Sequence, residues 1–265
     1  MQIPTRALGS TGIDVSCLGL GTVKFGRNQD VKYPQGFNLP EDSEIDRLLQ
    51  QARDLGINLL DTAPAYGSSE QRLGRLLRER EKWVIATKVG EQFLSGKSVF
   101  DFNANQVNLS IERSLRNLAT DYLDLVLIHS DGNDLAILES SDCLEALLNL
   151  KEKGLIRAIG MSTKTVDGGI RAAELTDVVM VTYNPGHREE ESVIDKAAEL
   201  NKGVLIKKAL NSGHLSTGGK HSAAEDLAFS LNKKGVSSVI VGTINPGHLE
   251  ANAEAALAAC KQNQG

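Results

Sequence analysis

Short apolar segments alternate with longer amphipathic segments along the whole chain. Eight apolar runs, rich in Val, Ile and Leu, predict strands over residues 17–20, 58–60, 83–87, 123–128, 156–160, 178–182, 204–207 and 236–241. Positions with helical spacing predict helices over residues 41–54, 69–80, 105–118, 141–152, 165–173, 189–201, 223–232 and 246–258. The strand runs are apolar almost throughout, which is typical of parallel strands covered by helices.

A strand followed by a helix, repeated eight times without a Gly/Ser/Pro-rich linker, predicts a (β/α)8 TIM barrel. We expect one barrel domain over residues 1–265, preceded by an N-terminal β-hairpin in ALGSTGIDVS with Gly12 at its turn. An open doubly wound sheet is the alternative architecture. It would have a G-x-G-x-x-G turn that opens a helix after the first strand, and the glycines of GLGTVKFG do not open one.

Composition narrows the classes of function. The chain has 29 Lys and Arg against 34 Asp and Glu, a formal net charge of −5, so we expect no nucleic-acid partner. Cys17, Cys143 and Cys260 have no CxxC spacing, which favours reduced thiols over a disulfide framework or a zinc site. The segment MQIPTRALGS lacks the apolar stretch of a signal peptide, and no apolar run approaches the roughly 20 residues that span a bilayer. We expect a cytoplasmic protein without a membrane partner, and the pattern does not define an oligomeric state.

Titratable side chains follow three consecutive predicted strands. Asp61 ends the second strand, with Tyr66 in the loop beyond it, Lys88 ends the third and His129 ends the fourth. Taken singly, these are ordinarily a capping carboxylate, a loop tyrosine, a surface lysine and a structural histidine. The carboxyl ends of barrel strands meet at one mouth, where catalytic groups sit. Their joint occurrence therefore favours a catalytic site over four separate structural roles.

The chemistry of this set is general acid catalysis by a phenol. We expect the Lys88 ammonium, which follows an apolar strand, to pair with Asp61. The pKa of free tyrosine is about 10, and a nearby ammonium is expected to lower the pKa of Tyr66. Such a phenol can protonate the alkoxide that forms when hydride adds to a carbonyl, while His129 hydrogen-bonds the substrate oxygen. Because no side chain can deliver hydride, the reaction requires a cofactor.

Four segments carry a resemblance to a known family: RALGSTGIDVSCLGLGTVKFG, DTAPAYGSSEQRLGRLL, IATKVG and DLVLIHS. They resemble the aldo-keto reductase superfamily, and the resemblance covers nearly the whole chain. It implies a (β/α)8 barrel that reduces aldehydes or ketones with NADP(H), or less often NAD(H), bound in extended form. It also implies Tyr66 as the general acid, Lys88 and Asp61 as the residues that tune it, and His129 as the residue that orients the carbonyl.

The same resemblance implies a set of cofactor-binding residues. These are Gly21, Thr22, Ser162, Thr163, Lys207, Ala209, Leu210, Ser212, Gly213, Gly242, Thr243, His248 and Asn252. The set departs from the family pattern, since Thr163 replaces an asparagine, Met180 a carboxamide-binding glutamine, and Lys207 a residue whose ring usually stacks on nicotinamide. Ile244 and His248 stand where Arg or Lys often binds the 2′-phosphate, so we expect NADP(H) only narrowly ahead of NAD(H).

Two other functions stay open on the sequence. One is a non-catalytic barrel that senses nicotinamide or binds a partner, because fold does not guarantee activity. The other is a Schiff-base lyase that uses Lys88, Lys207 or Lys208 at a strand end.

Three further segments carry expectations. His187, in YNPGHREEE, stands beside glutamates that we interpret as the acidic first turn of a helix, and we expect no metal site. The insert 27–40 is either a substrate-gating loop or an ordinary surface loop. Because the chain ends soon after its last helix, we expect an open site that accepts several carbonyl substrates.

Overall fold

Eight parallel strands close into a barrel in the computed structural model, which describes residues 2–31, 36–211 and 222–262. Each strand pairs with its neighbour in the chain, and the last pairs with the first. The strands are β3 (Leu18–Gly21), β4 (Leu59–Asp61), β5 (Val84–Val89), β8 (Leu123–His129), β9 (Ile156–Ser162), β10 (Val178–Thr182), β11 (Gly203–Lys207) and β12 (Ser238–Val241). The predicted TIM barrel is confirmed, and the open sheet is excluded by the closed pairing.

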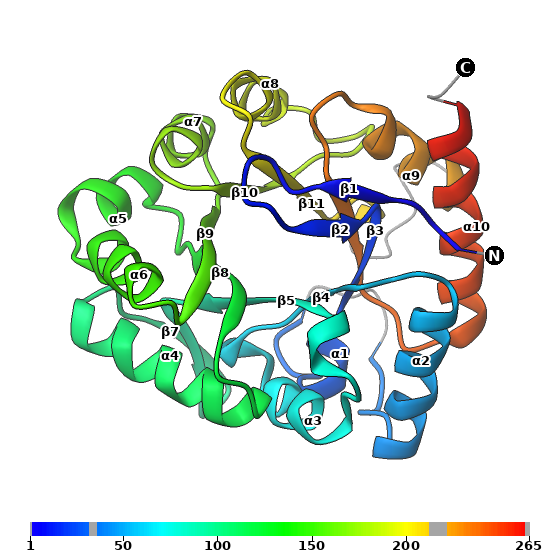
Figure 1. The fold of residues 1–265 in the computed structure, drawn as a ribbon, viewed down its shortest axis with the longest axis horizontal. Coiled ribbons are helices and arrows are strands. Elements are labelled where there is room, and N and C mark those ends of the chain that lie inside the picture. Colours follow the sequence, from blue (N-terminus) through cyan, green and yellow to red (C-terminus); the bar gives the residue numbers. More distant parts are fainter. Residues whose placement is uncertain (1, 32–35, 212–221, 263–265) are drawn as a thin grey trace.

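Helices surround the strands (Figure 1). They are α2 (Asp42–Asp54), α3 (Ser69–Leu76), α4 (Ala104–Leu118), α5 (Asp134–Ser140), α6 (Cys143–Glu152), α7 (Val166–Leu175), α8 (Glu191–Glu199), α9 (Ala223–Asn232) and α10 (Pro246–Gln262), with short turns at α1 (Val23–Gly26), η1 (Pro64–Tyr66) and η2 (Arg80–Lys82). Gly56 and Gly154, which follow α2 and α6, have φ of 84° and 77°, values that favour glycine and stop a helix.

Among the helices, α3 and α5 depart from the sequence-based prediction. Helix α3 ends at Leu76 rather than at residue 80, because Leu77 is extended and Arg80 turns inward to bond the Asp124 carboxylate at 2.7 Å. Helix α5 was not predicted. It is held by Asp134, whose buried carboxylate accepts hydrogen bonds from the backbone N–H of Lys164 at 2.9 Å and of Thr165 at 2.8 Å.

The N-terminal hairpin closes one end of the barrel. Strands β1 (Thr5–Ala7) and β2 (Asp14–Ser16) are antiparallel, and Gly12 has φ of 71°, as expected for the turn. Leu8, Ile13 and Val15 pack into the same apolar cluster as the inward-facing strand residues. Figure 1 shows this dark blue hairpin crossing the barrel. Because Leu8 packs against Gly203 at the start of β11, the hairpin covers the N-terminal ends of the strands and leaves the carboxyl ends for a site.

A second hairpin follows β5 and was also not predicted. Strands β6 (Glu91–Leu94) and β7 (Lys97–Phe100) pair antiparallel around Ser95 and Gly96, which both have positive φ, 51° and 81°. Gly90, with φ of 99°, turns the chain out of β5 into this hairpin. The turn brings Glu91 back over the carboxyl ends of the strands, where it contacts His129 at the end of β8.

Candidate active site

A buried ion pair lies at the carboxyl ends of β4 and β5. The Nζ atom of Lys88 is 2.5 Å from Oδ1 of Asp61 and donates a second hydrogen bond to the Thr62 carbonyl at 2.8 Å. Side-chain exposure is 1% for Lys88 and 8% for Asp61. The contact predicted from the spacing of the two strands is therefore confirmed, and the pair is shielded from water.

Tyr66 lies directly against this pair. It ends the short turn η1, and Lys88 Nζ is 4.7 Å from the centroid of its ring. Burial, together with the negative charges of Asp61 and Glu91, holds the pKa of Tyr66 well above its usual value of about 10. The expectation that Lys88 lowers this pKa is wrong for the free protein, because the lysine charge is matched by Asp61 at shorter range. The phenol consequently keeps its proton at neutral pH.

The backbone next to Tyr66 leaves no room for a side chain. Gly67 has φ of 61°, and a Cβ there would lie 2.1 Å from the Gly26 carbonyl oxygen. Changing Gly67 to alanine is expected to destabilise the fold by about 1–3 kcal/mol and to displace Tyr66. Urea unfolding checks the loss of stability and near-UV circular dichroism the displacement of the tyrosine, with Gly12→Ala as a control, because Gly12 also has a positive φ, 71°, but has open space around it. Equal losses in the two variants would show that φ strain alone, without the contact to Gly26, accounts for the effect.

His129 faces Tyr66 across the mouth, and Glu91 contacts its other side. The rings of His129 and Tyr66 are 6.3 Å apart and nearly perpendicular, at 85°. The Nδ1 atom of His129 is 2.7 Å from Oε2 of Glu91. Burial lowers the pKa of His129, although Glu91 opposes that shift. Burial works to raise the pKa of Glu91, yet His129, Ser98 and Arg27 together bring it down to about 2. The structure thus brings all four predicted residues together and adds Glu91.

Sequence reasoning missed Glu91. The run EQFLSGKSVF places apolar residues, Phe93 and Leu94 before and Val99 and Phe100 after, on either side of a Ser-Gly turn, which is consistent with a hairpin, and it begins where the third barrel strand ends. That pattern was the available signal that a carboxylate would return over the mouth.

A second polar group lies at the ends of β9 and β11. Lys207 Nζ donates hydrogen bonds to Ser162 Oγ at 2.8 Å and to the Thr163 carbonyl at 2.6 Å. Burial lowers the pKa of Lys207 to about 8, with Lys208 adding to the effect and Glu190 opposing it. Met180 is 2% exposed within the apolar barrel interior, where it offers no polar contact.

Glu190 contacts the residues around Lys207. Its carboxylate accepts hydrogen bonds from the Thr163 hydroxyl at 3.1 Å and from the Thr182 backbone N–H at 2.8 Å. Burial raises the pKa of Glu190. The glutamates after His187 were predicted to form an acidic first helical turn. Glu191 does lie in the first turn of α8, whereas Glu190 is the N-cap residue and its side chain is buried, only 4% exposed.

The other predicted cofactor-binding residues lie at strand ends or in helix α10, which contains His248 and Asn252. Gly21 ends β3 and Thr22 follows it, and the Thr22 hydroxyl donates a hydrogen bond to the Asp61 carbonyl at 2.9 Å. The remaining described members are Ala209, Leu210, Gly242, Thr243, Asn252 and His248, of which Ala209, Thr243 and Asn252 are buried and His248 is exposed. Ser212 and Gly213 lie outside the described residues, as does part of the insert 27–40. Binding by these residues stays a prediction.

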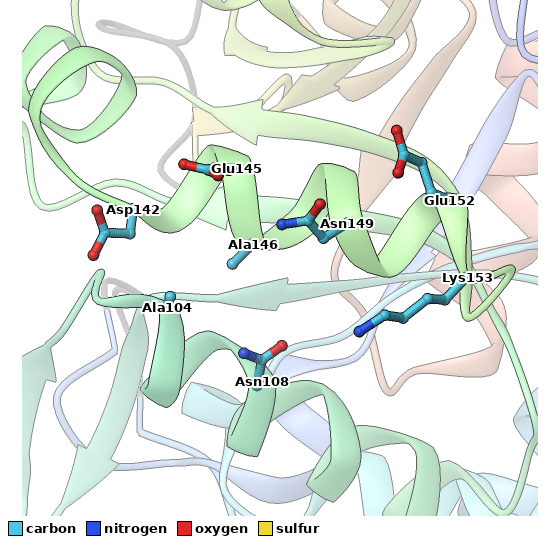
Figure 2. A pocket seen from close by; sticks show the side chains of 8 residues that line it. All are labelled: Ala104, Asn108, Asp142, Glu145, Ala146, Asn149, Glu152 and Lys153. Carbon is cyan, nitrogen blue, oxygen red and sulfur yellow. The ribbon is translucent and has the colours of Figure 1, made fainter.

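A cavity of about 630 Å³ lies elsewhere, on the outer surface between α4 and α6 (Figure 2). Asp142, Glu145 and Glu152 make its lining acidic, with Lys153 at one end. No residue of the predicted site lines it. Over the described ranges, no group of three or more His, Cys, Asp or Glu side chains is arranged to hold a metal ion. No helix within those ranges is long and apolar enough to cross a membrane.

The barrel and its polar mouth match a known family. The model of the aldo/keto reductase family matches residues 17–226. A crystal structure of a Pseudomonas aeruginosa protein, described as an aldo-keto reductase, superposes with a TM-score of 0.88 at 52% identity, covering 97% of this chain and 95% of that one. L-galactose dehydrogenase of Arabidopsis thaliana is 30% identical over 96% of this chain and 88% of its own length. D-threo-aldose 1-dehydrogenase of a Pseudomonas species is 26% identical, over 96% and 93%.

The fold and the mouth define a (β/α)8 barrel with a polar site at the carboxyl ends of its strands. The chain belongs to the aldo/keto reductase family. The family and its dehydrogenase members support a general oxidoreductase role for this barrel.

Proposed function

We propose that this protein reduces aldehydes or ketones to alcohols with a nicotinamide cofactor. The observation that carries the proposal is the position of Tyr66, whose ring lies 4.7 Å from the ammonium of the buried Lys88–Asp61 pair and faces His129 at 6.3 Å. The relatives named as dehydrogenases of L-galactose and of D-threo-aldoses support chemistry between a carbonyl and an alcohol.

Tyr66 acts as the proton donor in this proposal. Because its pKa is held well above 10, the phenol stays protonated at neutral pH and can give its proton to an alkoxide, which is a much stronger base. Lys88 and Asp61 hold the ring in place and set the charge beside it. His129 borders the same space, and the nitrogen that carries its proton decides whether it donates to a substrate or accepts from one.

The polar group at the ends of β9 and β11 fits a nicotinamide carboxamide. When bound, the nicotinamide supplies the hydride. The ammonium of Lys207 has three donors, and the hydrogen bonds to Ser162 and Thr163 use two of them. The third is available for a carboxamide oxygen, which compensates for the apolar Met180. The backbone at Ala209 and Leu210 is suited to the pyrophosphate, and Thr243, His248 and Asn252 to the adenosine. We propose NADP(H) narrowly ahead of NAD(H), because the exposed imidazole of His248 can contact a 2′-phosphate.

Changing Lys207 to methionine is expected to raise the Kd for NADPH by about 10- to 100-fold, the loss associated with a hydrogen bond to a charged group. In the wild type, the affinity should be constant below pH 8 and fall above it, because the pKa of Lys207 is about 8 and the charged form is the donor. Quenching of fluorescence on NADPH binding measures both effects. Lys208→Met is the matched control, since it removes the adjacent exposed ammonium but not the bonds to Ser162 and Thr163. Equal affinities in the wild type and Lys207→Met would contradict the assignment.

The function itself is tested by the oxidation of NADPH and of NADH by the wild-type protein with a panel of aldehydes and ketones. Turnover with at least one class of carbonyl compound is expected. Tight cofactor binding without turnover across the panel would overturn the proposal in favour of a nicotinamide-sensing protein.

The lowered pKa of Lys207 also favours one second candidate, a Schiff-base lyase, because a neutral amine is the nucleophile in that chemistry. Lys88 is unsuited to it, being paired with Asp61. Borohydride reduction in the presence of an aldehyde, followed by mass spectrometry, separates the two functions, since only the lyase would retain substrate mass on Lys207.

A further inference from the structure

Two of the three cysteines meet at the N-terminal end of the barrel, away from the mouth. Cys17 lies between β2 and β3, where its N–H bonds the Pro4 carbonyl at 3.0 Å and its own carbonyl accepts from the N–H of Val239 at 2.9 Å. Cys260 lies in the last turn of α10, and its thiol is within hydrogen-bonding reach of the Cys17 thiol. Figure 1 shows the blue segment that leads into β1 lying beside the red α10. The fold thus joins two thiols from opposite ends of the sequence.

Arg6 holds a positive charge against the sulfur of Cys260. Its Nη1 atom donates hydrogen bonds to the Leu231 carbonyl at 3.1 Å and to the Val236 carbonyl at 2.9 Å. These bonds fix the guanidinium on β1 so that Nη2 donates to Sγ of Cys260 at 3.3 Å. The C-terminal turn of a helix disfavours an anion. Arg6 is therefore the group that stabilises a thiolate at this position.

The two thiols hold their protons unequally. Cys17, together with Arg6, lowers the pKa of Cys260, although burial opposes the shift. Contact with Cys260, reinforced by burial, raises the pKa of Cys17. Cys143 on α6 differs from both, because burial alone raises its pKa to about 12. The pair consequently contains one thiolate and one thiol, the combination needed for a reactive cysteine and the cysteine that resolves it.

Exposure decides which sulfur a dissolved reagent meets first. Cys17 is 0% exposed, whereas Cys260 is 5% exposed and precedes the exposed Lys261. The last turn of a helix also opens at little cost in free energy, because it lacks the later hydrogen bonds that hold an internal turn. A small reagent therefore reaches Cys260 before Cys17.

We propose that Cys260 and Cys17 form an oxidation site, at which a peroxide converts Cys260 into a sulfenic acid and Cys17 then closes a disulfide. In the first step the Cys260 sulfur attacks a peroxide oxygen, the O–O bond breaks, and the leaving hydroxide or alkoxide takes a proton from water. In the second, the Cys17 sulfur attacks the Cys260 sulfur, the S–O bond breaks, and hydroxide leaves as water with the Cys17 proton. The peroxide gains the two electrons that the thiols lose. The site is independent of the proposed function.

The disulfide ties the last helix of the barrel to the segment before its first strand. Because the two cysteines stand near opposite ends of the chain, the bond closes a loop that contains most of the sequence. Such a cross-link restricts the unfolded chain strongly and stabilises the folded one. Cys17 precedes β3, whereas the mouth lies at the other end of that strand, beyond Gly21. The bond should therefore leave the mouth unchanged.

Treatment of the reduced full-length protein with hydrogen peroxide tests the site. After the peroxide is removed, the remaining thiols are alkylated in urea, and the peptides are mapped by mass spectrometry without reduction. We expect the three free thiols to fall to one, that of Cys143, and a disulfide-linked pair of peptides that contain Cys17 and Cys260.

Three cysteine variants separate the two steps. Cys17→Ser should stop at the sulfenic acid of Cys260, which dimedone traps as a single adduct. Cys260→Ser should leave Cys17 unoxidised, because the buried thiol keeps its proton. Cys143→Ser is the matched control, since it removes a buried thiol outside the pair, and it should form the disulfide as the wild type does.

The role of Arg6 is tested by Arg6→Gln, whose amide can still donate to a carbonyl but carries no charge. Alkylation of Cys260 by iodoacetamide at neutral pH should slow by about 10-fold, the change in thiolate that one unit of pKa produces. Circular dichroism checks that the variant is folded. Equal rates in the variant and the wild type would show that Arg6 does not activate the thiol.

Thermal unfolding measures the effect of the bond. Peroxide should raise the Tm of the wild type by about 5–10 °C, and the rise should be absent in Cys17→Ser and reversed by dithiothreitol. Three free thiols after a treatment that fully oxidises free cysteine, oxidation of Cys143 as fast as that of Cys260, or a disulfide between two chains would overturn the proposal. An oxidised protein no more stable than the reduced one would show that the bond does not tie the helix to the barrel.

Discussion

Replacing Tyr66 with phenylalanine is expected to lower kcat for aldehyde reduction by about 10²- to 10⁴-fold, the usual contribution of a general acid. The ring of phenylalanine keeps the contact with the Lys88 ammonium, which lies 4.7 Å from the centroid, so the fold and the affinity for NADPH should be nearly unchanged. The substitution removes only the hydroxyl group that donates the proton. Steady-state rates of NADPH oxidation, together with direct titration of NADPH binding, measure the two properties separately.

Tyr122→Phe is the matched control, since Tyr122 precedes β8 at the opposite end of the barrel and packs on Arg80, with 4.9 Å between the guanidinium and its ring. It should retain wild-type turnover. In the wild type, ionisation of Tyr66 should not reduce the rate up to about pH 9, because its pKa is raised above 10. Turnover by Tyr66→Phe at the wild-type rate would show that another group donates the proton.

Changing Lys88 to methionine is expected to destabilise the protein by about 3–5 kcal/mol, because it leaves Asp61 as an uncompensated buried charge. Methionine fills much the same volume, and the lost interactions are the bonds to Asp61 at 2.5 Å and to the Thr62 carbonyl at 2.8 Å. Urea unfolding followed by circular dichroism measures the free energy of unfolding.

The double variant Lys88→Met, Asp61→Asn is the informative partner. With the carboxylate also removed, much of the lost stability should return, since an uncharged amide costs far less to bury than an unpaired carboxylate. Both variants should reduce carbonyl compounds poorly. The double variant would therefore regain stability without regaining activity. A single variant as stable as the wild type would show that water reaches Asp61 and that the pair is not shielded.

The barrel could be predicted because its signal is local and repeated. Runs such as LDLVLI are apolar throughout, and each is followed by an amphipathic helix that ends at a glycine or a polar turn. Helix α5 escaped this reasoning because it is short and is held by Asp134, which bonds the backbone of Lys164 and Thr165 from another loop. The β6–β7 hairpin was not predicted because it interrupts the alternation of strand and helix on which the prediction rested.

The protonation behaviour of the site could not be read from strand order. The sequence places Lys88 beside Tyr66 and predicts a lowered pKa, but the actual shift depends on burial and on every charge in range. Asp61 matches the charge of Lys88, Glu91 adds a second negative charge, and the result is a raised pKa. A pattern along the chain contains the signs of the charges and not their distances.

The sequence by itself determined the class of fold and the meeting of Asp61, Tyr66, Lys88 and His129. Parallel strands that are neighbours in the chain bring their carboxyl ends to one mouth whatever the details of packing. Only the tertiary structure decided that Glu91 returns from a hairpin to contact His129, and that Lys207 crosses to Ser162 on another strand. Those contacts depend on the backbone turns at Gly90 and at the ends of β9 and β11, because these turns set the direction of single side chains. Differences of an ångström there decide which side chains are in contact, and hydrophobic periodicity does not record them.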